Sequence, residues 1–383
     1  MKNIILLIFL AFTINAFSQT TDKTVTLVVS GQGKTQDEAK QNALRSAIEQ
    51  AFGTFISSKT EILNDDLVKD EIVSVASGNI QKYEIISEVQ IPNGDFATSL
   101  NATVSVDKLT AFVESKGVVA EFKGNLFAFN IKQQILNEQS EILSIENMIN
   151  VCSKLMQNCF VYQINALNPI SDSQDNQKWI IPINIQVKTN QNIENLNNFL
   201  FKTLSRIALS NNEINDYETL GKKTYNINYY YNQSLNDFFL RTEKGKELFY
   251  YLNDFWYKAI LNIEITNGIK SISGNKLNKP KVQDDNYLNL FSDRSTGKGY
   301  GWYDLILNPN KINSKSIEIN EQQILGIHQV SKFSNQGSFG IKRSYTFIFP
   351  DSGTLVGNIK YSDYFKLEEL NRITEFKVSP IVN

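Results

Sequence analysis

The sequence predicts an α+β protein made of tandem small domains, in which antiparallel sheets carry helices on one face. Segments of alternating apolar and polar residues predict strands, segments with apolar residues at helical spacing predict helices, and a strong hairpin turn joins two long strands. The chain has 383 residues, of which 42% are hydrophobic and 20% are charged. Such a chain can form two or three domains with packed cores.

The pattern of residues 1–18 predicts an export signal rather than part of the folded domains. Lys2 precedes an apolar run from Ile4 to Phe12, which is too short to span a bilayer core of about 30 Å. Small side chains at Ala16 and Ser18 place the predicted cleavage after Ser18. No later stretch has about 18 consecutive apolar residues, so we expect no transmembrane segment. The expected location is therefore periplasmic or secreted.

Three domains are expected after the signal. They are an N-terminal α+β domain, a middle α+β domain and a C-terminal β-rich α+β domain, over residues 19–117, 118–215 and 216–383.

The N-terminal domain begins with a strand, Val25–Val29, which Gly31-Gln32-Gly33 is expected to break. Thr35 and Glu38 form a capping box for a helix that Gly53 is expected to stop. Alanines on the inner face would let this helix approach a sheet closely: Ala39, Ala43, Ala47 and Ala51.

A hairpin completes this domain. A short helix is expected over about residues 66–77, before two strands over about 83–91 and 96–106. Pro92-Asn93-Gly94-Asp95 joins the strands, and its Asn-Gly pair predicts a type I′ turn.

This order of elements resembles the N-terminal domain of flagellar assembly protein T, a family that also includes related outer-membrane lipoproteins. The resemblance covers about residues 25–116; it rests on the glycine pair, the alanine-lined helix, Gly53, the segment Ser77–Ile80 with Tyr83, and the hairpin. It implies an envelope-located, non-enzymatic module used in assembly or association. The chain lacks the lipobox cysteine, and no other feature indicates a flagellum, so we do not extend a flagellar role to it.

The middle domain is expected to contain a helix over about 126–157, broken near Ser140, two strands, and a second helix ending near Ile207. The two strands are expected at about 160–167 and 179–187. The C-terminal domain is expected to be mostly strands, near 225–231, 259–265, 303–307, 324–330, 345–349 and 355–361. Helices are expected near 244–256 and 365–371, the latter capped by Ser362-Asp363.

Composition argues against several functions. The net charge of −2 argues against a nucleic-acid binder held by phosphate contacts. One histidine and two cysteines exclude most zinc and iron–sulfur sites. Gly31–Thr35 imitates the end of a phosphate-binding loop but lacks the first glycine, because Val28 stands there. His328 is expected to be an ordinary strand histidine, so we expect no catalytic residue, no cofactor and no metal ligand.

Two alternatives stay open for Cys152 and Cys159. Export would place them in an oxidising compartment where a disulfide persists, but residues seven apart on one helix are about 10.5 Å apart along its axis. A disulfide therefore requires the helix to end before Cys159. Otherwise the two cysteines are buried free thiols.

Aromatic residues gather in the C-terminal domain, and tyrosine and tryptophan suit contact surfaces as well as cores. The aromatic residues are densest over residues 225–257, and we prefer the interpretation that these side chains belong to a core. The alternative is a contact surface made by Tyr229, Tyr230, Tyr231, Trp256, Tyr300 and Trp302.

Together these features favour a non-catalytic binding or assembly module of the cell envelope. Its expected partners are envelope proteins or components of the wall or outer membrane, and its oligomeric state is open. The alternative is a secreted carbohydrate-binding protein or hydrolase that uses the aromatic-rich C-terminal half.

Overall fold

A computed structural model describes residues 23–55, 78–115, 126–175, 177–231, 234–261, 263–268, 271–273, 301–303, 317–319, 328–332, 342–349, 351–353 and 355–380. The predicted export signal, the predicted helix at 66–77 and Tyr300 lie outside these residues.

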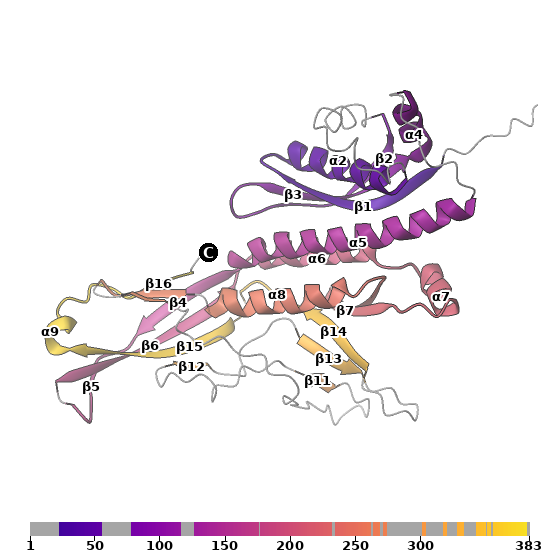
Figure 1. Cartoon of the computed structure of the whole chain (residues 1–383). Helices are drawn as coiled ribbons and strands as arrows, with labels where there is room; N and C mark the ends of the chain where they lie inside the picture. Colours follow the sequence, from indigo (N-terminus) through magenta and orange to yellow (C-terminus); the bar gives the residue numbers. More distant parts are fainter. Residues whose placement is uncertain are drawn as a thin grey trace, which may run out of the picture. The chain divides into compact units, whose positions relative to one another are not determined.

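The chain combines helices with mainly antiparallel sheets, which confirms the predicted α+β class (Figure 1). The helices are α2 (Gln36–Phe55), α4 (Val106–Ser115), α5 (Leu126–Gln157), α6 (Asn192–Ile207), α7 (Asn211–Thr219), α8 (Lys244–Leu261) and α9 (Leu367–Leu370). The strands are β1 (Thr24–Gly33), β2 (Ile80–Gln90), β3 (Phe96–Ser105), β4 (Phe160–Ala166), β5 (Ile170–Ser171), β6 (Lys178–Thr189), β7 (Tyr225–Tyr231), β8 (Ser234–Leu240), β9 (Ile263–Thr266), β10 (Ser271–Ser273), β11 (Gly301–Tyr303), β12 (Ile317–Ile319), β13 (His328–Lys332), β14 (Lys342–Ile348), β15 (Leu355–Lys366) and β16 (Lys377–Pro380).

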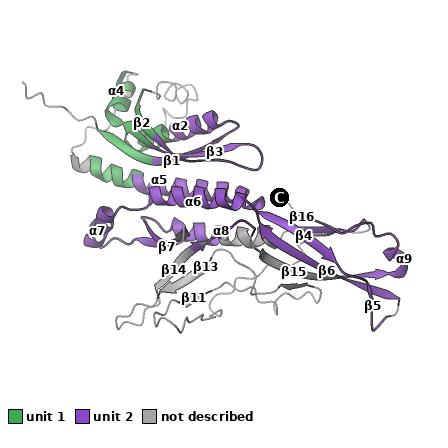
Figure 2. Cartoon of the chain, turned by 180° about the vertical axis from the view of Figure 1, so that it is seen from behind, with its two compact units in different colours: residues 1–27, 47–83, 102–136 green, residues 28–46, 84–101, 137–383 purple. Residues whose placement is uncertain are grey.

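The chain divides into two compact units, coloured in Figure 2. The first comprises residues 1–27, 47–83 and 102–136, and the second comprises residues 28–46, 84–101 and 137–383.

In the first unit, helix α4 replaces the end of a predicted strand. Ser105 ends β3, and its hydroxyl oxygen accepts a hydrogen bond from the Lys108 N–H at 3.2 Å. The Val106 N–H is bonded to the Lys23 carbonyl at 2.8 Å. A serine at this position caps a helix, so the apolar residues that follow continue as α4 instead of extending the strand.

In the second unit, the two glycines do not break β1. A Cβ atom on Gly31 would lie 2.3 Å from the Ala39 carbonyl oxygen and 2.4 Å from the Ala43 nitrogen. The absent side chain lets β1 run directly against α2, so the strand continues to Gly33.

The capping box of α2 is present in a modified form. The Glu38 N–H donates to the Thr35 hydroxyl at 3.1 Å, while the Glu38 carboxylate accepts from the Lys34 N–H at 2.8 Å. The predicted stop at Gly53 is wrong, because α2 ends at Phe55.

The hairpin turn is also of a different type from the one predicted. The Gly94 N–H bonds to the Ile91 carbonyl at 2.9 Å, which puts Pro92 and Asn93 at the central positions. Pro92 cannot take the positive φ that a type I′ turn needs there, and Gly94 takes a φ of 92° instead.

Helix α5 has the predicted bounds but not the predicted break. The hydroxyls of Ser140 and Ser144 both donate to the Val28 carbonyl, at 2.7 and 3.1 Å. These serines therefore contact β1 without interrupting the helix.

Two larger sheets form the centre of the second unit, in the orders β12-β15-β6-β4 and β11-β13-β14-β7-β8. Strand β15 pairs with β6 from Leu355↔Lys188 to Lys366↔Lys178. Strand β14 pairs with β7 in parallel, which the prediction of antiparallel sheets did not include. Strands from both sides of the predicted boundary at residue 215 therefore share one sheet.

The C-terminal elements differ in detail from the predictions. Residues 259–261 belong to α8, and the strand begins at Ile263. Ser362 and Asp363 lie within β15, so they do not cap a helix, and α9 begins after Lys366.

Candidate functional site

The predicted contact residues that lie on the sheet containing β7 occupy positions on both of its faces. Tyr229 is fully buried, and its hydroxyl donates to the Asn197 side-chain oxygen at 2.7 Å. Tyr231 stacks on Phe201 with ring centroids 4.1 Å apart. These two tyrosines belong to the core, in agreement with the preferred interpretation of the aromatic segment.

Of the remaining predicted contact residues, Tyr230 and Trp302 lie on strands of this sheet, Trp256 lies in a helix, and Tyr300 is outside the described residues. Tyr230 alternates with its neighbours on β7 and so occupies a position on the opposite face. Trp302 pairs with Val330 on β13, and Trp256 lies within α8. The set is therefore not one surface.

A row of polar positions crosses that opposite face. Asp237 pairs with Asn228, Asn228 with Thr346, and Thr346 with His328. Laterally paired residues share a face of a sheet. The four strands β8, β7, β14 and β13 thus place one carboxylate residue, one amide residue, one hydroxyl residue and the only histidine of the chain in line.

Two amide oxygens on this face have no hydrogen-bond partner. Asn228 is 1% exposed; its side-chain nitrogen donates to Asp237 at 2.5 Å, but its side-chain oxygen is unpaired. The side-chain oxygen of Asn226, two residues earlier on β7, is also buried and unpaired. Buried polar atoms without partners are uncommon in folded proteins, so this face calls for an explanation.

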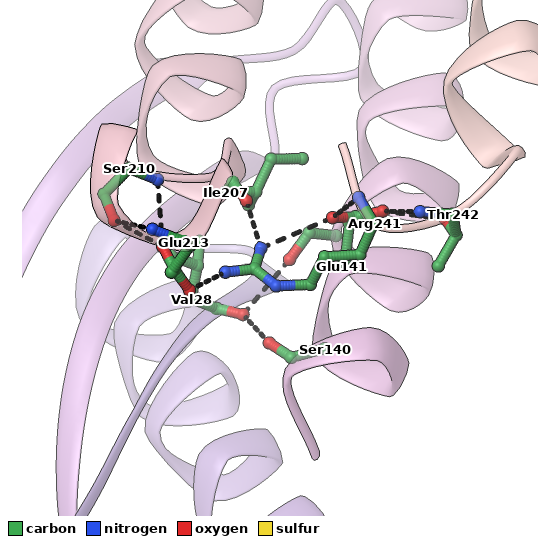
Figure 3. Close-up of polar contacts among 9 residues, drawn as sticks. Val28, Ser140, Glu141, Ile207, Ser210, Glu213, Arg241 and Thr242 are labelled. Carbon is green, nitrogen blue, oxygen red and sulfur yellow. Dashed lines mark hydrogen bonds and ion pairs between the residues drawn. The ribbon is translucent and has the colours of Figure 1, made fainter. Parts of the chain in front are cut away.

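A second polar feature, around Arg241, is fully paired (Figure 3). The Arg241 guanidinium donates to the Ile207 carbonyl at 2.7 Å and to the Glu213 carboxylate at 2.5 Å, and it lies 3.4 Å from the Glu141 carboxylate. The side chains of Glu141 and Arg241 are 1% and 10% exposed. The network joins α5, α6, α7 and the segment between β8 and α8.

Backbone donors complete this network. Glu141 accepts from the N–H groups of Arg241 and Thr242, each at 2.8 Å, and from the Thr242 hydroxyl at 2.8 Å. Ser210 and Glu213 form a capping box at the start of α7, with the Ser210 hydroxyl 2.8 Å from the Glu213 carboxylate. Because every charge meets a complementary group, the network fits a structural role.

The pKa values of the two carboxyl groups of the network, Glu141 and Glu213, are shifted in opposite directions. Burial raises the pKa of Glu141 above its usual value, and the hydrogen bonds from Arg241 and Thr242 only partly offset this effect. Burial also acts to raise the pKa of Glu213, but hydrogen bonds from Ser210 and the nearby Arg241 charge outweigh it and lower the pKa.

Cys152 and Cys159 are both buried and free in the structure. The Cys159 thiol donates to the Leu155 carbonyl at 3.2 Å, and burial raises its pKa to about 12. Burial raises the pKa of the Cys152 thiol further, and the neighbouring Cys159 adds to the shift. Of the two alternatives, the structure has buried free thiols, whose protonated form is a poor nucleophile.

The structure also bears on metals and membranes. Within the described ranges, no three His, Cys, Asp or Glu side chains come together as a set that could hold a metal ion. None of the helices in the described part of the chain is long and apolar enough to cross a membrane.

Sequence reasoning missed the Arg241 network and the polar face. The Ser210-x-x-Glu213 pattern was a usable signal, because it is the signature of a capping box. The burial of Glu141 and the pairing across β13, β14, β7 and β8 had no local signal. No protein-family model matches the chain, and neither the curated proteins nor the solved structures include a match.

Proposed function

We propose that the chain is an exported cell-envelope protein that acts as a non-catalytic binding or assembly module. One observation carries this proposal: large apolar side chains are exposed on or next to β5, the end of β15 and α9. Figure 1 places these elements at one end of the paired strands β6 and β15, which we call the arm. These apolar side chains are half or more exposed, and we call them the arm-tip residues: Leu167, Ile170, Tyr364 and Leu367.

The sheet register brings part of this group together. Ile170 pairs with Ile180, which in turn pairs with Tyr364. Laterally paired residues share a face, so these three positions form an apolar row across the arm. Apolar groups that stay exposed in a contiguous patch are typical of contact sites with other molecules.

Two sequence features support the envelope part of the proposal. Residues 1–18 have the pattern of an export signal, and about residues 25–116 resemble a family of envelope assembly proteins. The proposed partners are accordingly envelope proteins or components of the wall or outer membrane.

Site-specific photocrosslinking in the native host tests this proposal. A photoreactive residue at position 170 or 364 is expected to capture the same discrete envelope component, and one at Asp216, an exposed residue of α7, is not. Ile170→Ser combined with Leu367→Ser is expected to abolish capture from position 364. Failure of both arm positions to capture any envelope component would contradict the proposed role.

The second candidate is a secreted carbohydrate-binding protein or hydrolase that uses the C-terminal half. The two unpaired amide oxygens on β7 favour its binding form. Glycosidic hydrolysis generally uses two carboxylates, whereas the polar row that contains Asn228 has one, Asp237.

A further inference from the structure

We propose that strand β2 pairs with the same strand of a second copy of this chain, antiparallel and about a twofold axis at Tyr83. This dimer contact goes beyond the envelope role proposed above, and the arm-tip residues play no part in it. Three observations carry it: β2 is an edge strand, its first half is exposed on both faces, and its charges complement themselves in one register.

Strand β2 lies at the edge of its sheet. The sheet has the order β1-β3-β2, so β3 pairs with one edge of β2, and no strand of the described residues pairs with the other. On β1, at the far side of the sheet, the Val28 carbonyl accepts hydrogen bonds from Ser140 and Ser144 of α5. An edge strand presents N–H and C=O groups that can pair with a further strand. The outer edge of β2 therefore offers a template for strand addition.

The first half of β2 is open to solvent on both of its faces. Successive residues of a strand point to opposite faces of the sheet, and the residues from Gln81 to Ile85 are all exposed. Tyr83 and Ile85, which share one face, are 46% and 42% exposed. Further along the strand, Ser87 and Val89 are buried. The exposed half thus combines uncovered apolar side chains with an unpaired strand edge, and a neighbouring strand would cover both.

Symmetry limits the registers that two copies of β2 can adopt. In an antiparallel pair, directly opposite residues share a face of the sheet. A contact between identical copies about a twofold axis is self-complementary, so that if residue i meets residue j of the second copy, j also meets i. The two residues must then be an even number of positions apart, because only such residues share a face of one strand. The axis therefore passes through a residue of β2 and not between two residues.

The charges of β2 favour the axis at Tyr83. In this register Lys82 lies opposite Glu84 of the second copy, and symmetry forms the same pair twice. An axis at Lys82 or at Glu84 would place two like charges directly opposite each other, which is destabilising. An axis at Ile86 would place Glu84 opposite Glu88, with the same effect.

The apolar residues separate the axis at Tyr83 from an axis at Ile85. An axis at Ile85 has no like-charge contact, but it places Glu84 opposite Ile86. With the axis at Tyr83, Ile86 lies opposite Ile80, and Tyr83 lies opposite the Tyr83 of the second copy. Aromatic pairs and pairs of opposite charge across two strands both stabilise a sheet, so this register is the favoured one.

The Glu84 side chain is already held in place by one partner. Its Oε1 atom accepts a hydrogen bond from Arg206 of α6 at 2.7 Å, and both side chains remain largely exposed. An ionised carboxylate accepts more than one hydrogen bond, so Lys82 of a second copy can bind the other oxygen. A side chain that is ordered before binding loses less conformational entropy when the contact forms.

Sedimentation equilibrium of the purified full chain tests the pairing. A monomer–dimer equilibrium is expected between roughly 1 and 100 µM, because one strand pair is a small interface. Lys82→Glu and Glu84→Lys each place like charges opposite each other at two points, and each is expected to weaken the dimer about tenfold or more. Combining both substitutions restores the two opposite-charge pairs and is expected to recover the wild-type dissociation constant.

Glu88→Lys is the matched control, because Glu88 is exposed on the same strand but lies outside the paired segment, residues 80–86. It is expected to leave the dimer unchanged. A wild-type chain that stays monomeric at about 100 µM would overturn the proposal. The same follows if Glu88→Lys weakens the dimer as much as Lys82→Glu does, or if the combined variant fails to recover it.

Engineered cysteines test the register directly. Tyr83→Cys places two cysteines opposite each other, at the Cα separation of about 4.5–5.5 Å that a disulfide can bridge. Ile85→Cys places them four residues apart along the strands, roughly 13 Å, which is too far. The native Cys152 and Cys159 are buried, so the wild type is expected to give no crosslink. Under mild oxidation Tyr83→Cys is expected to form a disulfide-linked dimer and Ile85→Cys is not; the reverse result would overturn the register.

Discussion

At the scale of single residues, Glu141 shows how the fold handles a charge that it removes from water. The carboxylate meets a guanidinium, two backbone N–H groups and a hydroxyl, so each oxygen is paired. Such a pair adds little net stability compared with an apolar replacement of both partners, because desolvation offsets the attraction. Its effect is to fix one arrangement, in which the segment after β8 docks on the middle of α5.

Removing Glu141 is expected to be costly, because the N–H groups of Arg241 and Thr242 lose their acceptor and the largely buried Arg241 keeps only Glu213 as a charge partner. Glu141→Ala is expected to lower the free energy of unfolding by about 3–5 kcal/mol, measured by urea denaturation. Glu146→Ala is the control on the same helix; Glu146 lies 3.4 Å from Lys244 in a half-exposed ion pair. It is expected to cost at most about 1 kcal/mol. If Glu141→Ala and Glu146→Ala lowered the free energy of unfolding equally, Glu141 would not be a buried partner of Arg241.

Glu213 predicts a dependence of stability on pH. Its pKa is lower in the folded protein than the usual 4.5, so its charged form is favoured by folding. The stability that it contributes is present above the unfolded pKa and is lost as the pH falls through the folded pKa. Wild-type protein is therefore expected to lose more stability than Glu213→Gln between about pH 6 and pH 3. If the urea midpoints of the wild type and Glu213→Gln fell by the same amount over this pH range, the lowered pKa assigned to Glu213 would be contradicted.

Residue-level features were predictable where they are local in sequence. Thr35 and Glu38 lie three apart, and the capping box between them follows from that spacing. Glu141 and Arg241 are 100 residues apart, and nothing in either neighbourhood indicates the other. The unpaired oxygen of Asn226 had no signal either, since it depends on which side chains surround the strand.

At the scale of elements, Gly31 and Gly53 look alike in the sequence but occupy their positions for different reasons. Gly31 and Gly53 were both interpreted as positions that end an element, and both lie inside one. Gly31 is required because backbone atoms of α2 occupy the place of a Cβ, whereas a Cβ at Gly53 would meet nothing within 4 Å. Sequence alone does not distinguish them, because the distinction lies in the neighbouring element.

The two glycines therefore predict opposite results for the same substitution. Gly31→Ala is expected to lower the free energy of unfolding by about 1–3 kcal/mol or more, because β1 and α2 must move apart. Gly53→Ala is expected to be neutral or to raise it by up to about 1 kcal/mol, since alanine is the better helix former. Chemical denaturation of both variants measures the difference. If Gly31→Ala left the free energy of unfolding unchanged, β1 and α2 would not be in close contact.

At the scale of the whole molecule, each of the two larger sheets pairs strands that lie far apart in the sequence. Strand β6 lies between β4 and β15, and β7 lies between β8 and β14. The strands themselves were largely predicted from alternation, but their pairing was not. Alternation reveals which face of a strand is buried and says nothing about which strand lies beside it. The predicted boundary at residue 215 rests on a local change of pattern, and the pairing of β6 with β15 crosses it.

This pairing predicts that residues 19–215 do not fold alone. Without β15, strand β6 loses one of its two neighbours, and apolar side chains such as Ile183, Ile185 and Val187 lose part of the sheet that holds them in the core. The fragment also lacks Arg241, so Glu141 would remain without its cation. We expect poor dispersion in its amide NMR spectrum and no cooperative thermal transition, whereas the full chain is expected to show both good dispersion and cooperative unfolding. A well-dispersed, cooperatively unfolding fragment would instead establish that residue 215 marks the end of an independent folding unit, and that β15 is added to a sheet already formed.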